Sequence, residues 1–121
     1  MKNLLLFCVL LLFVSCNSDT NGIPCTEEAR AGLNVTVRDA QTTNYLGIGT
    51  TIVATDGTYS ETLQFIEGII PSFAGAWERE GNYTLTVSAQ GFTTFVSETI
   101  TVASDECHVI PQQVEISLQP E

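Results

Sequence analysis

The sequence predicts an all-β protein, an antiparallel β-sandwich of about seven short strands. Apolar and polar residues alternate over residues 33–38, 83–88 and 114–118, so that each segment turns one face to a core and the other to water. Turn-forming pairs that contain glycine interrupt the chain between such segments. No stretch shows a sustained apolar period of 3.6 residues, which argues against an amphipathic helix.

The expected strands follow one another along the chain. We place them at residues 33–38, 51–54, 59–65, 69–73, 83–88, 93–102 and 114–118. The turns between them fall at Asp56-Gly57, Glu67-Gly68, Gly81-Asn82 and Gln90-Gly91. Threonine is abundant in these segments, as is usual on a half-buried pleated surface. Residues 25–121 are enough for one domain with a single core.

The N-terminus has the layout of an export signal that ends in a cysteine. Lys2 is followed by an apolar run over residues 4–14, which is too short to span a bilayer, because spanning takes about 20 apolar residues. Small Ser15 then precedes Cys16, and this arrangement resembles the lipobox of bacterial lipoproteins. The resemblance implies that residues 1–15 are a signal peptide and that Cys16 is lipidated and becomes the N-terminus.

The residues after Cys16 indicate how the domain is held. Residues 16–24 are mostly polar, include a glycine and a proline and show no periodicity, so we expect a flexible stalk there. Asn17 follows the cysteine in place of the Asp that marks inner-membrane retention in some bacteria. We therefore expect a protein of the cell envelope, anchored by its lipid to the outer membrane.

The charge balance limits the possible partners. After residue 15 the chain carries three arginines against fourteen acidic residues, a net charge of −11. This charge repels nucleic acid, which we exclude as a partner. The pair Asp56 and Glu61, or the pair Asp105 and Glu106, offers oxygen ligands for calcium. Because the chain lacks the alternating Asp-x-Asp spacing of a calcium loop, we expect these carboxylates to be solvated and predict no metal.

Two cysteines remain after export and lipidation, Cys25 and Cys107. The compartment beyond the inner membrane is oxidising, so we expect them to form a disulfide. The alternative is a metal site made of Cys25, Cys107 and His108. That site would have only three ligands and no paired-cysteine spacing, so we favour the disulfide.

Several segments together resemble the carboxypeptidase regulatory-like domain. They are residues 33–39, residues 52–57 and residues 80–92, and the resemblance extends over about residues 31–120. That family has a seven-stranded, transthyretin-like (prealbumin-like, Ig-like) sandwich, with a Gly-x-Tyr strand followed about eight residues later by glycine and an aromatic residue. Gly81, Tyr83, Gly91 and Phe92 occupy those places here. The resemblance implies a scaffold and assigns no catalytic residue.

The residues of this motif also have a physical reason of their own. Gly81 gives the backbone freedom at the start of the strand, Tyr83 begins its buried face, and Gly91 permits a positive φ in the following turn. Standing alone after a lipidated cysteine, such a domain resembles lipoproteins of the Bacteroidetes.

Few residues suggest chemistry. His108 is the only histidine, and beside Cys107 at the edge of the last expected strand we expect it to have a surface or turn role. No nucleophile-elbow sequence is present, and we expect no enzyme and no cofactor. Trp77 is the most informative side chain, because an exposed indole could stack on a sugar with help from Tyr45 or Phe92. We favour the alternative that Trp77 caps the core, since a small domain needs large core residues.

These observations favour a lipid-anchored, non-catalytic binding or accessory module at the bacterial cell envelope. Its expected partners are the membrane, through the lipid, and a protein or glycan whose identity is open. One alternative is a carbohydrate-binding surface lipoprotein that uses loop aromatics. Another is a structural spacer or assembly subunit that pairs through an edge strand of a sheet.

Overall fold

The computed structural model describes residues 24–121, and these residues contain strands and no helix. The expected signal peptide, Cys16 and residues 17–23 of the expected stalk lie outside the described residues. The strands are β1 (Ala31–Asp39), β2 (Tyr45–Leu46), β3 (Thr50–Asp56), β4 (Tyr59–Thr62), β5 (Gln64–Ile66), β6 (Ser72–Trp77), β7 (Gly81–Ala89), β8 (Phe95–Val96), β9 (Ile100–Val102) and β10 (Gln112–Leu118).

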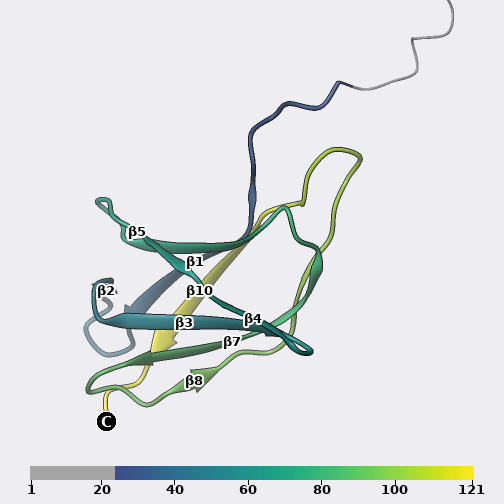
Figure 1. Cartoon of the computed structure of the whole chain (residues 1–121). Helices are drawn as coiled ribbons and strands as arrows, with labels where there is room; N and C mark the ends of the chain where they lie inside the picture. The colour runs from purple at the N-terminus through teal and green to yellow at the C-terminus, as the bar shows by residue number, and fades with distance from the viewer. Residues whose placement is uncertain (1–23) are drawn as a thin grey trace, which may run out of the picture.

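The strands form two sheets that face each other, as in a β-sandwich (Figure 1). The first sheet has the order β10-β1-β6-β5, with β2 also paired to β1, and the second has the order β4-β3-β7-β8, with β9 also paired to β7. All pairs are antiparallel except β1 and β10, which run parallel from Leu33 opposite Gln112 to Asp39 opposite Leu118. The alternating pattern could not reveal this parallel pair, because it reports which face is buried and not the direction of a neighbour.

The core lies between the two sheets and is built by alternate residues of their central strands. The fully buried side chains of β1, β3 and β7 are Leu33, Val35, Val37, Ile52, Ala54, Tyr83, Leu85 and Val87. Each large apolar side chain buried here contributes about 1.5–3 kcal/mol relative to exposure. The alternation predicted from the sequence for β1 and β7 is therefore confirmed.

The ten strands exceed the expected seven because two expected strands are interrupted and one short strand was missed. The expected strand 59–65 changes sheet at buried Leu63, so that β4 pairs with β3 whereas β5 pairs with β6. The expected strand 93–102 breaks at Ser97. There the Leu85 N–H donates to the Ser97 hydroxyl at 2.9 Å, and not to a backbone carbonyl as it would in a continuous ladder. The missed strand is β2, which has only two residues.

The expected strand at 69–73 was misplaced. Ile69 and Ile70 are 100% and 51% exposed and belong to the loop after β5, and β6 begins only at Ser72. Pro71 lies directly before that first residue and has no N–H to donate to a sheet. An apolar pair in a loop gave the same sequence signal as a buried strand.

Gly81 of the Gly-x-Tyr strand and Gly91 in the turn after it are required for different reasons. Gly91 has φ +87°, so its expected role in the turn is confirmed. Gly81 is required for space, because a Cβ there would lie 2.5 Å from Asp56 Oδ2 and 3.1 Å from Arg79 Nη1. A side chain at Gly81 would displace one of these two groups.

Candidate functional site

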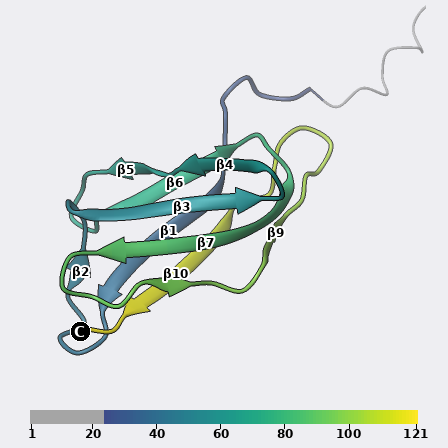
Figure 2. The same ribbon diagram turned by 60° about the horizontal axis from the view of Figure 1, so that its bottom comes forward.

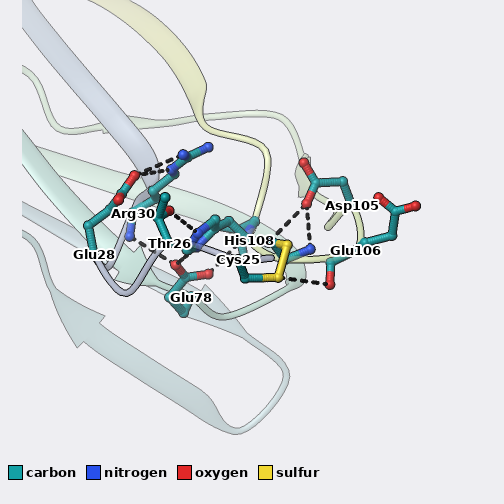
Figure 3. Close-up of a disulfide and its surroundings, with 10 residues drawn as sticks. Cys25, Thr26, Glu28, Arg30, Glu78, Asp105, Glu106 and His108 are labelled. Carbon is teal, nitrogen blue, oxygen red and sulfur yellow. Dashed lines mark hydrogen bonds and ion pairs between the residues drawn. A yellow bond between two sulfur atoms is a disulfide. The ribbon is translucent and has the colours of Figure 1, made fainter. Parts of the chain in front are cut away.

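The described residues concentrate their charged and polar contacts at the end of the molecule where the chain leads into β1. We call residues 24–30 the lead-in segment. It lies against the turn between β6 and β7 and against the loop between β9 and β10 (Figure 3). The disulfide Cys25–Cys107 joins the lead-in segment to that loop, with Cα atoms 5.3 Å apart and a sequence separation of 82 residues. The disulfide predicted from the sequence is therefore present.

His108 is the centre of this contact group. Its ring is 7% exposed, and both of its nitrogens have partners. Nδ1 lies 2.5 Å from Glu78 Oε2 and donates to it, because a carboxylate only accepts. Nε2 is hydrogen-bonded to the Thr26 hydroxyl at 3.0 Å. His108 lies in the loop between β9 and β10, where a turn position was expected, but the expected surface position was wrong, since its ring is buried and joins three segments.

Glu78 is the acceptor that holds these segments together. Besides the His108 ring, it accepts the N–H groups of Val109 at 3.0 Å and Arg30 at 3.1 Å. The hydrogen bond from His108, and next that from Val109, lower the pKa of Glu78, although burial opposes the shift. Its side chain is 33% exposed, so the carboxylate is screened in part by water.

Backbone strain positions this acceptor. Ala76 and Glu78 have φ values of +54° and +49°, in the left-handed region that residues other than glycine rarely adopt. The Glu78 N–H donates to the carbonyl of Arg30 at 3.0 Å, and the Arg79 N–H donates to the carbonyl of Ala76 at 3.2 Å. These bonds compensate for conformations that cost of order 1–3 kcal/mol each.

Asp105 accepts hydrogen bonds within the loop between β9 and β10. Its Oδ1 accepts the N–H groups of His108 at 2.9 Å and Cys107 at 2.8 Å. These two bonds, the one from His108 first, lower the pKa of Asp105. The carboxylate thus closes the turn that carries the disulfide.

Beside these groups lies an open hollow of about 460 Å³. Its acidic lining residues are Glu27, Glu28, Glu78, Asp105 and Glu106. Glu28 pairs with Arg30 at 2.8 Å. In the described part of the chain, no group of three or more His, Cys, Asp or Glu residues is arranged to hold a metal ion. The arrangement holds three segments together, and within it the Thr26 hydroxyl, the His108 ring and the Glu78 carboxylate are hydrogen-bonded in sequence.

A second contact group lies around Arg79, the residue after Glu78. Its guanidinium lies 3.6 Å from the centre of the Tyr59 ring. It donates to Asp56 Oδ2 at 3.1 Å and to the Tyr83 hydroxyl at 2.9 Å. The Tyr83 hydroxyl in turn donates to the Arg79 carbonyl at 2.9 Å. Arg79 thus joins the ends of β3, β4 and β7.

The two acidic residues considered for calcium, Asp56 and Glu61, have separate partners. Asp56 pairs with Arg79, whereas Glu61 accepts the Tyr59 hydroxyl at 2.6 Å and the Ala76 N–H at 3.2 Å. The hydrogen bond to Glu61 raises the pKa of Tyr59. The two carboxylates serve as acceptors within the fold, and they are not simply solvated as expected.

The three aromatic residues considered for ligand contact do not come together. Trp77 is opposite Ala31 at the start of β1, whereas Tyr45 is opposite Arg38 near its end, roughly 23 Å away at 3.3 Å per residue. The Tyr45 ring lies 4.3 Å from the Arg38 guanidinium, which also donates to its hydroxyl at 2.6 Å. Trp77 is 45% exposed, so the expectation that it caps the core was wrong.

Phe92 lies beyond the far end of β10, in a bridge with Pro120, and packs in part against the core. Because Leu118 at the end of β10 is opposite Asp39 at the end of β1, Phe92 and Trp77 lie at opposite ends of the first sheet. Trp77 is therefore the only one of the three that is an exposed aromatic at the end held by the disulfide.

Sequence reasoning found the disulfide but missed the role of Glu78. Glu78 contacts His108 across 30 residues of sequence, and no short motif marks such a pair. The one available signal was His108 itself, as a lone histidine next to a disulfide cysteine.

Comparison of the sequence with known protein families finds no matching family, and a search of curated proteins finds no similar protein. None of residues 24–121 forms a helix that is long and apolar enough to cross a membrane. The class that the structure defines is an all-β protein of two facing sheets with one disulfide.

Proposed function

We propose that this chain is a lipid-anchored, non-catalytic binding or accessory module at the bacterial cell envelope. The observation that carries the proposal is the disulfide at the start of the domain. It joins the domain to the chain nine residues after Cys16, the proposed lipid attachment site. A force on the tether would therefore act on the bridge and on the contacts of His108 and Glu78 before it reached β1.

The non-catalytic part of the proposal rests on how the polar groups are used. The single histidine has both ring nitrogens engaged by Thr26 and Glu78. A hydroxyl, an imidazole and a carboxylate in this order also occur in hydrolases, but this ring is only 7% exposed and Thr26 lies next to the disulfide-bonded Cys25. In this arrangement the imidazole holds segments of its own chain together.

We also propose that the domain has the seven-stranded type of the carboxypeptidase regulatory-like domain. If β4 and β5 are counted as one strand that changes sheet, and β8 and β9 as one interrupted strand beside β7, seven strands remain apart from the two-residue β2. The positions of Gly81, Tyr83 and Gly91 support this type. Tyr83 is fully buried, and Gly91 has a positive φ in the turn.

Replacement of the proposed lipidated cysteine tests the anchoring. Cys16→Ala should move the protein from the membrane fraction to the soluble fraction, because acyl chains that hold it there are no longer attached. Outer and inner membranes separated on a sucrose gradient would test the proposed outer-membrane location. Cys16→Ala protein that stays in the membrane fraction with unchanged mobility would contradict the proposal.

A second candidate function is carbohydrate recognition, which the 45% exposure of Trp77 favours. Aromatic rings at binding surfaces combine an apolar face with a polar edge. The candidate predicts glycan-dependent changes in Trp77 fluorescence, and loss of glycan-array binding in Trp77→Ala. Glycan binding that is unchanged in Trp77→Ala would exclude this role of the indole.

A further inference from the structure

The two sheets have four edges, and they are unequal. The first sheet ends in β5 with three residues and in β10 with seven. The second sheet ends in β4 with four residues and, on the other side, in β8 and β9 with two and three. Short edge strands limit pairing with other chains. Within residues 24–121, only β10 presents a long edge.

β10 is held extended and is paired along one side alone. Its neighbour is β1, and no other strand within residues 24–121 pairs with it (Figure 2). The segment that contains β8 and β9 borders its two ends, through the bridge Ser104–Val109 before the strand and Phe92–Pro120 after it, so an added strand can lie only beside residues 112–118. A fixed, extended strand loses little further conformational freedom when it binds a partner.

The side chains of β10 give this edge little protection against pairing. Gln113, Glu115 and Ser117 are exposed, and Val114 and Ile116 lie on the other face, half-buried and buried. No proline interrupts residues 112–118, and Glu115 is the only charged residue among them. Charged side chains, prolines and bulges are the usual means of blocking an edge.

We infer that the outer edge of β10 binds an extended segment of a partner protein, which adds to the first sheet as a further strand. The segment alternates apolar residues, beside Val114 and Ile116, with polar residues on the exposed face. Glu115 is opposite Thr36 of β1 and makes no ion pair within the described residues, so it is available to a Lys or Arg of the segment. The inference identifies the binding surface of the proposed module, and only the choice between a partner protein and a second copy uses the proposed membrane tether.

Charge and geometry favour a different protein over a second copy as the occupant. Each copy has a net charge of −10, so two copies repel each other, whereas a neutral or basic segment does not. β1 and β10 are parallel, so antiparallel pairing of two β10 strands would place the two lead-in segments at opposite ends of the joint sheet. Two chains tethered to one membrane would have to reach it from opposite ends.

Selection of a random library of displayed ten-residue peptides on the purified, exported protein tests the inference. The selected peptides should alternate apolar and polar residues and contain Lys or Arg. In amide-exchange NMR, alternate amides of residues 112–118 should exchange fast in the free protein and slowly with peptide bound. N-methylation of every second peptide residue should abolish binding in one frame and spare it in the other, because only alternate N–H groups of an added strand face β10.

A matched pair of charge reversals provides the control. Glu115→Lys should weaken a selected basic peptide about 3- to 10-fold, since opposite charges across a strand pair stabilise it and like charges destabilise it. Glu67→Lys makes the same charge change in the exposed loop after β5 and should leave binding unchanged. Equal effects of both variants would show that only net charge matters and would overturn the inference.

Other results would also overturn it. They include a library that yields no peptide, and peptides whose contacts map to Trp77 or to the loop of Ile69 and Ile70. N-methylation that weakens binding equally in both frames would exclude strand addition. A β10-mediated dimer found by analytical ultracentrifugation would assign the edge to a second copy. Loss of membrane attachment in Cys16→Ala bears on the anchor alone, so the two proposals fail separately.

Discussion

Removal of the disulfide should lower the stability of the domain strongly while leaving its fold intact. The bridge closes a loop with a sequence separation of 82 residues, which corresponds to about 4.5 kcal/mol of unfolding free energy in the chain-entropy treatment. Cys25 lies in the lead-in segment, outside every strand, so its loss does not touch a strand pair or the core. The main effect is therefore on the unfolded chain, which gains conformational freedom.

The double variant Cys25→Ala/Cys107→Ala tests this reasoning by thermal unfolding, followed by circular dichroism and by the fluorescence of Trp77. Its melting temperature should fall by on the order of 20 °C, while its far-ultraviolet spectrum below the transition stays that of the unmodified protein. As a control, treatment of the unmodified protein with iodoacetamide without reductant should leave the melting temperature unchanged, because Cys25 and Cys107 are joined in the bridge. A melting temperature within a few degrees of the unmodified protein would refute the reasoning.

Four further substitutions, with Glu67→Gln as a control, test the contacts that hold the fold. In folded protein the pKa of Glu78 lies below that of the unfolded chain, so its contribution is present above the unfolded value and is lost as pH falls through the folded one. Glu78→Gln should therefore lower the urea midpoint at pH 7 and flatten its decline in acid, whereas Glu67→Gln should follow the unmodified protein. Tyr83→Phe should cost about 1 kcal/mol in urea unfolding, because it leaves the Arg79 carbonyl without its donor. Phe73→Ala should cost about 3–5 kcal/mol and Trp77→Ala clearly less, since their exposures are 1% and 45%; equal losses would contradict the assignment of Trp77 to the surface.

The sequence predicted what depends on local patterns. Alternation located β1, β7 and β10, because their inward side chains are more buried than their outward ones. The position of Gly91 in a turn could be predicted because such a turn requires a positive φ, which glycine adopts without strain. At Ile69 and Ile70 an apolar pair lies in an exposed loop, so the strand expected over residues 69–73 was placed too early and begins at Ser72.

The contact group around the disulfide depends on long-range placement, which no local pattern reports. Cysteine number and compartment predicted the bridge without any knowledge of the fold. His108 was expected at the surface, and only the folded chain brings Thr26 and Glu78 to its two ring nitrogens. Trp77 was misassigned for a related reason, because the strain at Ala76 and Glu78 that shapes the end of β6 leaves no mark in the sequence.

The consecutive residues Glu78 and Arg79 explain how this end of the domain holds the structure together. Glu78 points to the lead-in segment and to His108, whereas Arg79 contacts Tyr59 and Tyr83 of the second sheet. One turn thus locks the lead-in segment to both sheets, and the charged groups that do this are not free for a ligand. The β10 edge has no comparable set of contacts, since its outer backbone groups have no strand partner within residues 24–121. The proposed tethered module would need a rigid attachment and a free surface, and these two requirements would be met by different parts of this fold.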